Sequence, residues 1–342
     1  MKSLPFDAIL VQSFGGPEGM DEVVPFLENV LRGRNVPRAR LEEVAEHYKQ
    51  FNGISPINSQ NRALIKALRS ELAGHGINLP IHFGNRNWHP LLNDTMRQMV
   101  SDGVKKVLVI VTSAYSSYSG CGQYREDLVR AQTELGSDAP QCERICAFYN
   151  HPGFIEANVD HVKQAFESIA SLHRSRTSLV FTAHSIPVSM ASASDYVAQL
   201  QDTATQIAEE IGYRDWDLVF QSRSGPPQQP WLEPSLDDHL QVLSDRGVKD
   251  VVVVPIGFLS DHMEVIFDLD VEAQQRCETL GLRMVRSHTV GTHPAFVAAL
   301  RHLIEERLTE TPIRLALGHR GPSPDTCPEG CCLDLSSSRR RN

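Results

Sequence analysis

Residues 251–273, VVVVPIGFLSDHMEVIFDLDVEA, join a fully apolar run to a segment that carries acidic side chains at regular spacing. The valines at 251–254 predict a buried parallel strand, because so apolar a run is stable only where both faces of the sheet are covered. Pro255 and Gly257 end this strand. We therefore expect an α/β fold, in which the loop after the strand lies at the edge of the sheet where ligands bind.

The next segment, from His262 to Leu280, has the apolar rhythm of a helix. Glu264, Asp268 and Glu272 recur every four residues along it, so that their carboxylates share one stripe. Acids at this spacing also occur on the solvated face of an ordinary amphipathic helix. Spacing alone leaves both interpretations open.

A second segment, LVFTAHSIP at residues 179–187, again runs from a strand into a loop. His184 stands where the strand ends, and Pro187 prevents immediate continuation into a helix. A single histidine is most often structural. A His and a Glu at the carboxyl ends of two parallel strands could instead form a metal-binding or proton-transfer pair.

Four stretches carry a more specific signal than any one of these patterns. They are LVQSFGGPEG at 10–19, FNGISPIN at 51–58, FTAHSIP at 181–187 and PIGFLSDHMEVIFDLDVE at 255–272. Together and in this order they resemble the ferrochelatases, enzymes that insert ferrous iron into a porphyrin. The resemblance extends from Ile9 to Thr292.

The resemblance implies roles for the residues already singled out. His184 and Glu264 match the metal-site pair of the family, and Asp268 and Glu272 match its acidic ridge, proposed to relay iron inward or protons outward. The chemistry is suitable, because imidazole and carboxylate groups both bind iron and accept protons, and two pyrrole protons must leave during insertion.

The resemblance also bears on the porphyrin. Ser55 and Tyr124 match residues that contact the porphyrin carboxylates in the Gram-positive branch of the family. Ser55 could alternatively be a simple turn residue, and Tyr124 a packing residue at the start of a helix. LRGRNVP at 31–37 and EHYKQFNGISPIN at 46–58 look more like the actinobacterial enzymes that metallate coproporphyrin III. Many other coproporphyrin enzymes of the family have, at the position of Phe14, a tyrosine that can ligate the product iron. Actinobacterial members also lack this tyrosine, so the assignment stands and this ligand is not expected.

Other functions remain open at this stage. The protein could insert iron into protoporphyrin IX, or cobalt or nickel into a related tetrapyrrole. It could also bind haem or iron without turnover and act as a redox sensor. Turnover beyond one metalloporphyrin per chain would separate the enzymes from the binding protein.

Composition limits the partners. The chain has 342 residues, 41% hydrophobic and 22% charged, with a net charge of -9, which disfavours affinity for nucleic acid or an anionic membrane. No apolar run approaches the roughly 20 residues that span a bilayer, and the amino terminus is typical of a first strand rather than a signal peptide. We expect a cytoplasmic monomer that binds coproporphyrin III and ferrous iron and contacts the next haem-pathway enzyme transiently.

Strand and helix patterns alternate through both halves of the chain. They predict two similar Rossmann-like lobes, each a parallel sheet covered by helices on both faces, with an active-site cleft between them. The expected strands are 8–13, 81–83, 106–111, 144–148, 178–182, 218–221 and 250–254, and the expected helices are 21–31, 40–51, 60–72, 124–134, 193–211, 234–246, 262–280 and 294–308. The expected domains are a first lobe at 1–150, a second lobe with the metal site at 151–292, a helix returning to the first lobe at 293–310, and an irregular tail at 311–342.

The tail contains a group of thiols. Cys327, Cys331 and Cys332 lie in TCPEGCC, and three thiols this close in a cytoplasmic protein favour a soft metal or an iron–sulfur cluster over disulfides. Some ferrochelatases hold a [2Fe-2S] cluster with three carboxyl-terminal cysteines and a fourth from the body of the chain. The resemblance therefore implies such a cluster, and zinc is the alternative.

The remaining cysteines supply candidates for the fourth ligand. We favour Cys146, on an expected strand of the first lobe, with Cys142 and Cys121 as alternatives. Cys277 lies on an expected helix of the second lobe, where a single cysteine is most often a small core residue.

Overall fold

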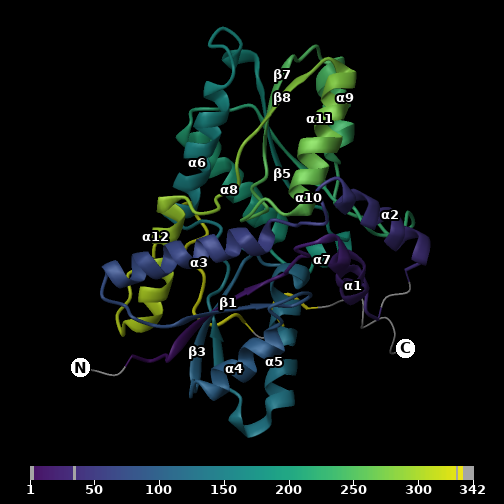
Figure 1. Cartoon of the computed structure of the whole chain (residues 1–342). Helices are drawn as coiled ribbons and strands as arrows, with labels where there is room; N and C mark the ends of the chain where they lie inside the picture. The colour runs from purple at the N-terminus through teal and green to yellow at the C-terminus, as the bar shows by residue number, and fades with distance from the viewer. Residues whose placement is uncertain (1–3, 34–35, 329, 334–342) are drawn as a thin grey trace. The chain divides into compact units, whose positions relative to one another are not determined.

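A computed structural model describes residues 4–33, 36–328 and 330–333 of the chain. The chain divides into two compact units. The first comprises 1–112, 123–145 and 303–312, and the second comprises 113–122, 146–302 and 313–342. Each unit contains one four-stranded parallel sheet, in the order β2-β1-β3-β4 in the first and β6-β5-β7-β8 in the second (Figure 1). The expectation of an α/β chain with two similar lobes is confirmed.

In the first unit, strands alternate with helices. The strands are β1 (Ala8–Ser13), β2 (Ile81–Asn85), β3 (Lys106–Val111) and β4 (Gln141–Arg144). The helices are α1 (Met20–Val30), α2 (Arg38–Lys49), α3 (Ile57–Gly74), α4 (Leu92–Ser101) and α5 (Gln123–Leu135), with a short 3₁₀ turn, η2 (Gly136–Asp138).

The second unit repeats this plan. Its strands are β5 (Ser178–His184), β6 (Trp216–Gln221), β7 (Asp250–Val254) and β8 (Arg283–Arg286). Its helices are α6 (Pro152–Glu167), α7 (Val188–Ala191), α8 (Tyr196–Glu210), α9 (Leu236–Asp245), α10 (Met263–Val265) and α11 (Gln274–Leu280), with the 3₁₀ turn η3 (Arg174–Arg176) and the π-helices η1 (Tyr118–Gly122) and η4 (Ile266–Ala273). The last helix, α12 (Pro294–Leu308), contributes residues to both units.

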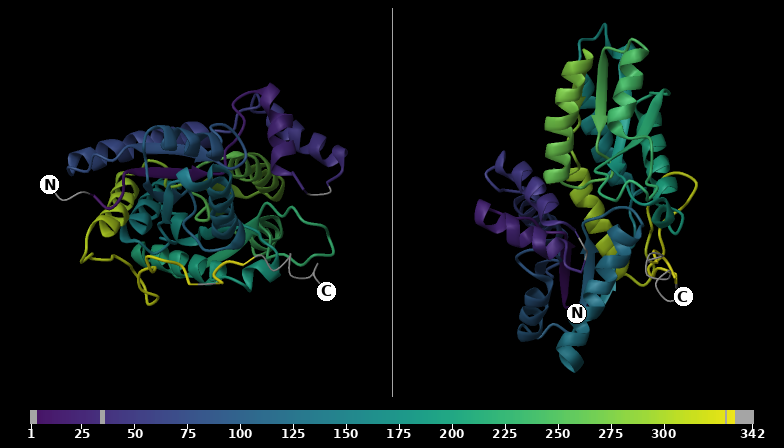
Figure 2. Two further views of the ribbon diagram at one scale, coloured as in Figure 1. Left: turned by 90° about the horizontal axis from the view of Figure 1, so that it is seen from below. Right: turned by 90° about the vertical axis from the view of Figure 1, so that its right-hand side faces the viewer.

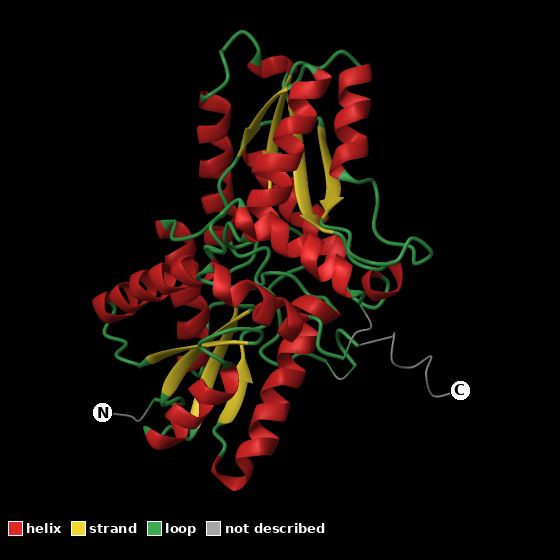
Figure 3. Cartoon of the chain, turned by 45° about the vertical axis from the view of Figure 1, so that its right-hand side comes forward, coloured by secondary structure: helices red, strands yellow, loops and turns green. Residues whose placement is uncertain are grey.

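Apolar side chains cover both faces of the second sheet, as the valine run predicts. Val251 and Val253 pack with the helix residues Leu240 and Leu269 on the face that carries α9, α11 and η4. Val252 is equally buried but points to the opposite face, where α6 and α8 contact the strands. Figures 2 and 3 show helices beside the sheets, and Figure 1 labels α9 and α11 next to each other, in agreement with the contacts between them.

The first sheet is covered in the same way. Leu10 and Val109 pack against α4 and α5 through Met96 and Leu128. Ile9, which points to the other face, is also completely buried. Burial of both faces explains why the strands read as continuous apolar runs rather than as an alternating pattern.

The strand order places a switch point in each unit. In the second sheet β5 pairs with β6 on one side and with β7 on the other, so the connections leave the two central strands in opposite directions. Open α/β sheets bind ligands at the carboxyl ends of such strands. In this unit that position is the end of β5 and the loop 255–262.

The secondary structure differs from the expectation in three ways. The fourth strand is β4 rather than 144–148, because pairing with β3 ends at Arg144 opposite Val109. The helix expected at 262–280 is interrupted by the π-helix η4. The edge strand β8, which is short and polar, and the helices α4, α6 and α7 were not expected. Helix α7 begins at Val188, directly after Pro187, where no immediate helix was expected, because proline is tolerated at the start of a helix. Tail residues 334–342 lie outside the described part of the chain.

No helix in the described ranges combines the length and the apolar composition needed to cross a bilayer. This finding agrees with the hydropathy of the sequence.

We expect Gly257→Ala to destabilise the second unit. A Cβ at Gly257 would lie 2.6 Å from the Cβ of Ala183 and 2.7 Å from its Cα, on the strand that ends at His184. Overpacking of this kind costs about 1–3 kcal/mol, which urea unfolding followed by circular dichroism would measure. The control is Gly74→Ala, since a Cβ there meets no atom within 4 Å. Equal stability of the two variants would contradict the close approach of loop and strand.

Candidate active site

His184 and Glu264 come together in the second unit, as expected. His184 is the last residue of β5, and Glu264 lies in α10 immediately after the loop that follows β7. The imidazole Nε2 lies 3.6 Å from Glu264 Oε1, and the two side chains are 29% and 50% exposed. Both groups are therefore close enough to act together and remain accessible to a substrate.

The other nitrogen of the imidazole is already engaged. His184 Nδ1 lies 2.5 Å from the backbone oxygen of Ser185, a contact in which the ring N–H donates. This bond fixes the orientation of the ring and directs Nε2 toward Glu264. Histidines that bind metals commonly use one nitrogen in this way and present the other to the ion.

Glu264 and His184 shift each other's pKa. Burial by itself lowers the pKa of His184, but the carboxylate of Glu264 outweighs this effect and raises it to about 9. Burial likewise raises the pKa of Glu264, and the His184 imidazolium reverses the shift and lowers it to about 2. In the metal-free protein at neutral pH, the pair is an imidazolium ion-paired with a carboxylate.

Asp268 has a different environment. Burial raises its pKa to about 7, a shift that the neighbouring carboxylates of Glu264 and Glu272 reinforce and a hydrogen bond donated by the Ser222 hydroxyl opposes. Ser222 has a φ of 61°, a left-handed conformation that is uncommon for a residue with a side chain. The solvated-surface interpretation therefore describes Glu272, which is exposed, better than Asp268.

Gln221 links the elements that carry these groups. Its Oε1 accepts a hydrogen bond of 2.7 Å from the Thr182 hydroxyl on β5, and its Nε2 donates to the backbone oxygen of Glu264 at 3.1 Å. The same nitrogen lies 3.4 Å from Asp268 Oδ2. One buried amide thus connects the strand of His184 with the helix of Glu264.

Two further residues support the pair. His262 Nδ1 accepts a hydrogen bond of 3.2 Å from the Glu264 backbone N–H and caps α10. The Tyr196 hydroxyl on α8 donates to the backbone oxygen of His184 at 3.0 Å. Sequence reasoning missed Gln221, Ser222, His262 and Tyr196. For Gln221 and Ser222 a signal was present, since both stand at the carboxyl end of a correctly expected strand.

Ser55 and Tyr124, the expected porphyrin contacts, lie in the first unit and are both buried, at 4% and 5% exposure. The Ser55 N–H donates to the Pro17 oxygen at 2.8 Å, and the guanidinium of Arg86 lies 5.3 Å from the centre of the Tyr124 ring.

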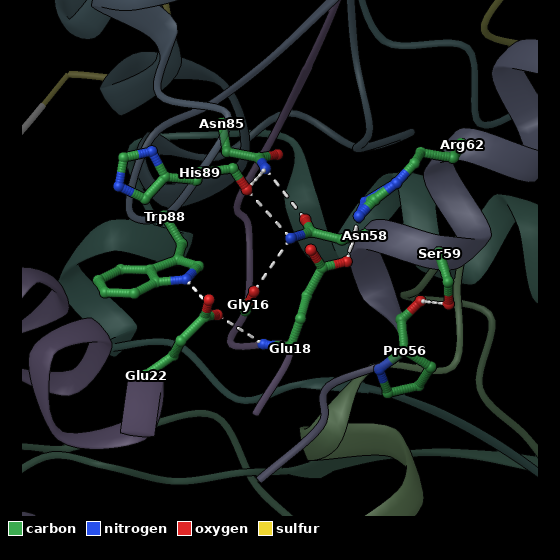
Figure 4. A network of polar contacts seen from close by, with 10 residues as sticks. All are labelled: Gly16, Glu18, Glu22, Pro56, Asn58, Ser59, Arg62, Asn85, Trp88 and His89. Carbon is green, nitrogen blue, oxygen red and sulfur yellow. Dashed lines mark hydrogen bonds and ion pairs between the residues drawn. The ribbon is translucent and has the colours of Figure 1, made fainter. Parts of the chain in front are cut away.

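A polar network joins the two amino-terminal motifs of the first unit (Figure 4). Asn58 Nδ2 donates to the oxygens of Gly16 and His89 at 3.0 and 3.1 Å, and Asn85 Nδ2 donates to Asn58 Oδ1 at 3.0 Å. Glu18 also forms an ion pair with Arg62. The segments 10–19 and 51–58 therefore form one structure at the carboxyl end of β1.

Five thiols gather in the second unit, from three segments of the chain. The sulfurs of Cys146 and Cys327 are 3.0 Å apart, and those of Cys331 and Cys332 are 3.4 Å apart. The Cys121 thiol, in η1, hydrogen-bonds with both Cys327 and Cys332. The structure thus brings together all four expected ligands and also the alternative Cys121.

The other two cysteines lie elsewhere. Cys142 belongs to the first unit, packs against its core and points its sulfur at the Pro140 oxygen, and burial raises its pKa to about 12. Cys277 is completely buried in the core of the second unit, which confirms it as a small core residue.

The clustered thiols resist ionisation. Hydrogen bonds with Cys121 and Cys146, followed by burial, raise the pKa of Cys327, and contact with Cys121 likewise raises that of Cys332. Clustered thiols resist ionisation because their negative charges repel, and a bound metal removes this penalty. In the described residues no group of three or more His, Cys, Asp or Glu side chains is arranged to hold a single metal ion. A [2Fe-2S] cluster instead requires two thiolates at each of two irons, and close thiol pairs are present.

Comparison with known proteins identifies relatives over almost the whole chain. The sequence model of the family described as Ferrochelatase matches residues 6–308. A ferrochelatase from Rhodopirellula baltica is 53% identical over 330 residues, covering 96% of this chain and 94% of that protein. A coproporphyrin III ferrochelatase from Streptomyces coelicolor is 49% identical over 352 residues, covering 96% and 93%.

Solved structures agree on the fold. SirB from Bacillus subtilis with Fe3+ superimposes with a TM-score of 0.55 at 14% identity, covering 88% of this chain and 95% of that one. At this level of identity the likeness concerns the fold alone.

We expect Glu264→Gln to lower the pKa of His184 from about 9 to no more than its ordinary value near 6.5, because the charge that raises it is removed. Titration of the His184 ring signal by NMR in metal-free protein would measure the shift. The interaction that raises the pKa of His184 makes its full contribution to the stability of the fold below about pH 6.5. This contribution is lost as the pH rises through about 9. The difference in unfolding free energy between wild type and Glu264→Gln should fall over that interval.

The matched control for this titration is Glu272→Gln, which removes an exposed carboxylate from the same helical stripe. It should leave the His184 titration near pH 9. If the pKa of His184 stays high in Glu264→Gln, then the carboxylate of Glu264 is not the group that raises it.

Proposed function

The chain belongs to the ferrochelatase family, and we propose that it inserts ferrous iron into coproporphyrin III to form coprohaem for haem synthesis, with His184 and Glu264 acting at the metal and proton site. Family membership makes the protein a porphyrin metal chelatase, a lyase. The choice of coproporphyrin III rests on relatives such as the Streptomyces enzyme and on the motifs at 31–37 and 46–58.

The observation that carries the assignment of the site is the pairing of His184 with Glu264 at the switch point of the second sheet. Insertion exchanges two pyrrole N–H protons for one ferrous ion. Imidazole and carboxylate oxygen are suitable ligands for ferrous iron, and Nε2 becomes available when its proton leaves. The carboxylate of Glu264 stays charged over the physiological pH range and so can hold a cation or an imidazolium.

We assign the proton transfer to Asp268. A group with a pKa near 7 accepts and releases protons readily at neutral pH, and Asp268 lies four residues from Glu264 along the same segment. Glu272 continues the stripe to solvent-exposed positions. This arrangement supports a path on which pyrrole protons leave or iron arrives. Ser55 and Tyr124 remain our candidates for the porphyrin carboxylates.

We also propose that the thiol group holds a [2Fe-2S] cluster. Cys146 and Cys327 form one close pair, and Cys332 has contacts with both Cys331 and Cys121. The cluster would supply redox-active iron and would link the tail rigidly to η1. Zinc bound by the same thiols is the competing assignment.

The test of the reaction is an anaerobic assay with ferrous iron that compares coproporphyrin III with protoporphyrin IX under multiple-turnover conditions, followed by loss of porphyrin fluorescence. We expect faster conversion of coproporphyrin III. His184→Ala should reduce turnover by at least about 100-fold while porphyrin binding persists. The matched control is His173→Ala, which removes another histidine–carboxylate pair, between His173 and Asp250 at the opposite end of β7.

The outcomes separate the alternatives. Preference for protoporphyrin IX would keep the site and change the substrate. At most one equivalent of metalloporphyrin per chain would favour a binding protein without turnover. Full activity of His184→Ala would remove the role assigned to the pair.

We expect Cys332→Ser to abolish the visible absorbance of the cluster and its iron and sulfide in protein purified without oxygen. Cys121→Ser and Cys146→Ser in parallel would show which of these thiols is a ligand. Cys277→Ala, which alters a core cysteine outside the group, is the control and should retain the cluster. Unchanged colour and iron content in Cys332→Ser would exclude Cys332 as a ligand. Wild-type protein without iron and sulfide would exclude the cluster, and zinc without sulfide would establish the competing assignment.

A further inference from the structure

Arg286 forms a fork of ion pairs beside the proposed metal site. It is the last residue of β8, and its side chain is only 14% exposed. Nε lies 2.5 Å from Asp270 Oδ1 and Nη2 lies 3.0 Å from Asp270 Oδ2, so the contact with this carboxylate is bidentate. Nη1 donates to Asp261 Oδ1 at 2.9 Å.

The two aspartates stand on either side of Glu264 in the chain. Asp261 is in the loop that follows β7, directly before the His262 that caps α10. Asp270 is in η4, the helix that continues from Glu264. A single guanidinium therefore connects the segment that enters the Glu264 turn with the segment that leaves it.

The helix that carries Asp270 needs such support. A π-helix, with hydrogen bonds between residues five apart, is rare and occurs mostly as a single turn within an α-helix. Leu269 anchors η4 in the core, and Ser222 holds Asp268 from the side of β6. The contact between Arg286 and Asp270 adds a further anchor, so that rotation of η4 about its axis is opposed by apolar and polar contacts.

We propose that Arg286 is a positioning residue that sets the distance of Glu264 from His184 by fixing Asp261 and Asp270 together. The proposal rests on the proposed function only in that the assay of iron insertion is one of its readouts. Arginine is required for this role, because a planar fork can bind one carboxylate with two nitrogens and a second carboxylate with a third. Lysine keeps the charge but presents a single nitrogen.

Arg283 provides a matched control on the same strand. Its Nε lies 2.6 Å from Asp250 Oδ1, an ion pair at the amino end of β7 and so at the other end of the sheet from His184. If the pairs on β8 only stabilise the fold, then Arg283→Lys and Arg286→Lys should have similar effects on every measurement.

The experiment compares Arg286→Lys with Arg283→Lys in the full-length protein. We expect Arg286→Lys to lower kcat for iron insertion by about 10- to 100-fold, the range typical of a misplaced catalytic group, with unchanged porphyrin affinity by fluorescence quenching. Arg283→Lys should keep the wild-type kcat. Asp270→Asn, which weakens one arm of the fork, should have a smaller effect, and its combination with Arg286→Lys should be less than additive.

A second readout does not require turnover. In metal-free protein the NMR signal of the His184 ring should move in Arg286→Lys and stay in place in Arg283→Lys, because only the first variant shifts Glu264. If wild type has no chelatase activity, the proposed function fails and this signal still tests the positioning role. Equal kcat values or an unmoved ring signal in Arg286→Lys would overturn the proposal. If Arg286→Lys does not fold, then kcat and the His184 ring signal of Asp270→Asn test the proposal instead.

Discussion

The register between β5 and β7 is the constraint on which the candidate site depends. Ser178 is opposite Val251 and Phe181 is opposite Val254, so β5 continues for three residues beyond the end of its neighbour. The loop after β7 covers this extension, with the Gly257 N–H bonded to the Thr182 oxygen at 3.1 Å. His184 therefore lies beside the loop that leads from β7 into α10. All four valines of β7 are buried and both faces of the sheet are apolar, so side-chain alternation does not fix this register, and the bond between Gly257 and Thr182 helps to hold it.

The sequence predicts most of this arrangement because its central parts follow simple rules. A strand buried on both faces has to be apolar, and the carboxyl ends of neighbouring parallel strands lie at the same edge of the sheet. These rules made a contact between His184 and Glu264 possible, and the family resemblance singled out the pair. No comparable sequence rule predicts the π-helix η4. Its hydrogen-bond pattern depends on the contacts of Asp268 and Asp270 with other elements, and periodicity alone reads the segment as an ordinary helix.

The thiols show the same division between local and nonlocal information. Cys327, Cys331 and Cys332 attract attention by spacing alone, as members of one short motif. The partners Cys121 and Cys146 are separated from them by most of the chain, and the expected strand around Cys146 does not form. Only the path of the tail across the second unit, fixed in part by hydrogen bonds from Asn150 Nδ2 to the oxygens of Leu317 and Gly321, brings these segments together.

Two carboxylates on one helical stripe have opposite electrostatic environments, and this contrast supports the different roles that we propose for them. Glu264 faces an imidazolium and stays ionised, whereas the pKa of Asp268 is raised to about 7 by burial and neighbouring acids. Groups whose surroundings push their pKa values apart commonly take different roles in acid–base chemistry. Ser222 limits the shift at Asp268, and it does so from a left-handed backbone conformation that costs of the order of 1 kcal/mol or more. A hydroxyl held at such a cost in a site that already contains the Gln221 amide is best explained by a need to stabilise the charged form of Asp268, since the fold by itself would be served as well by glycine.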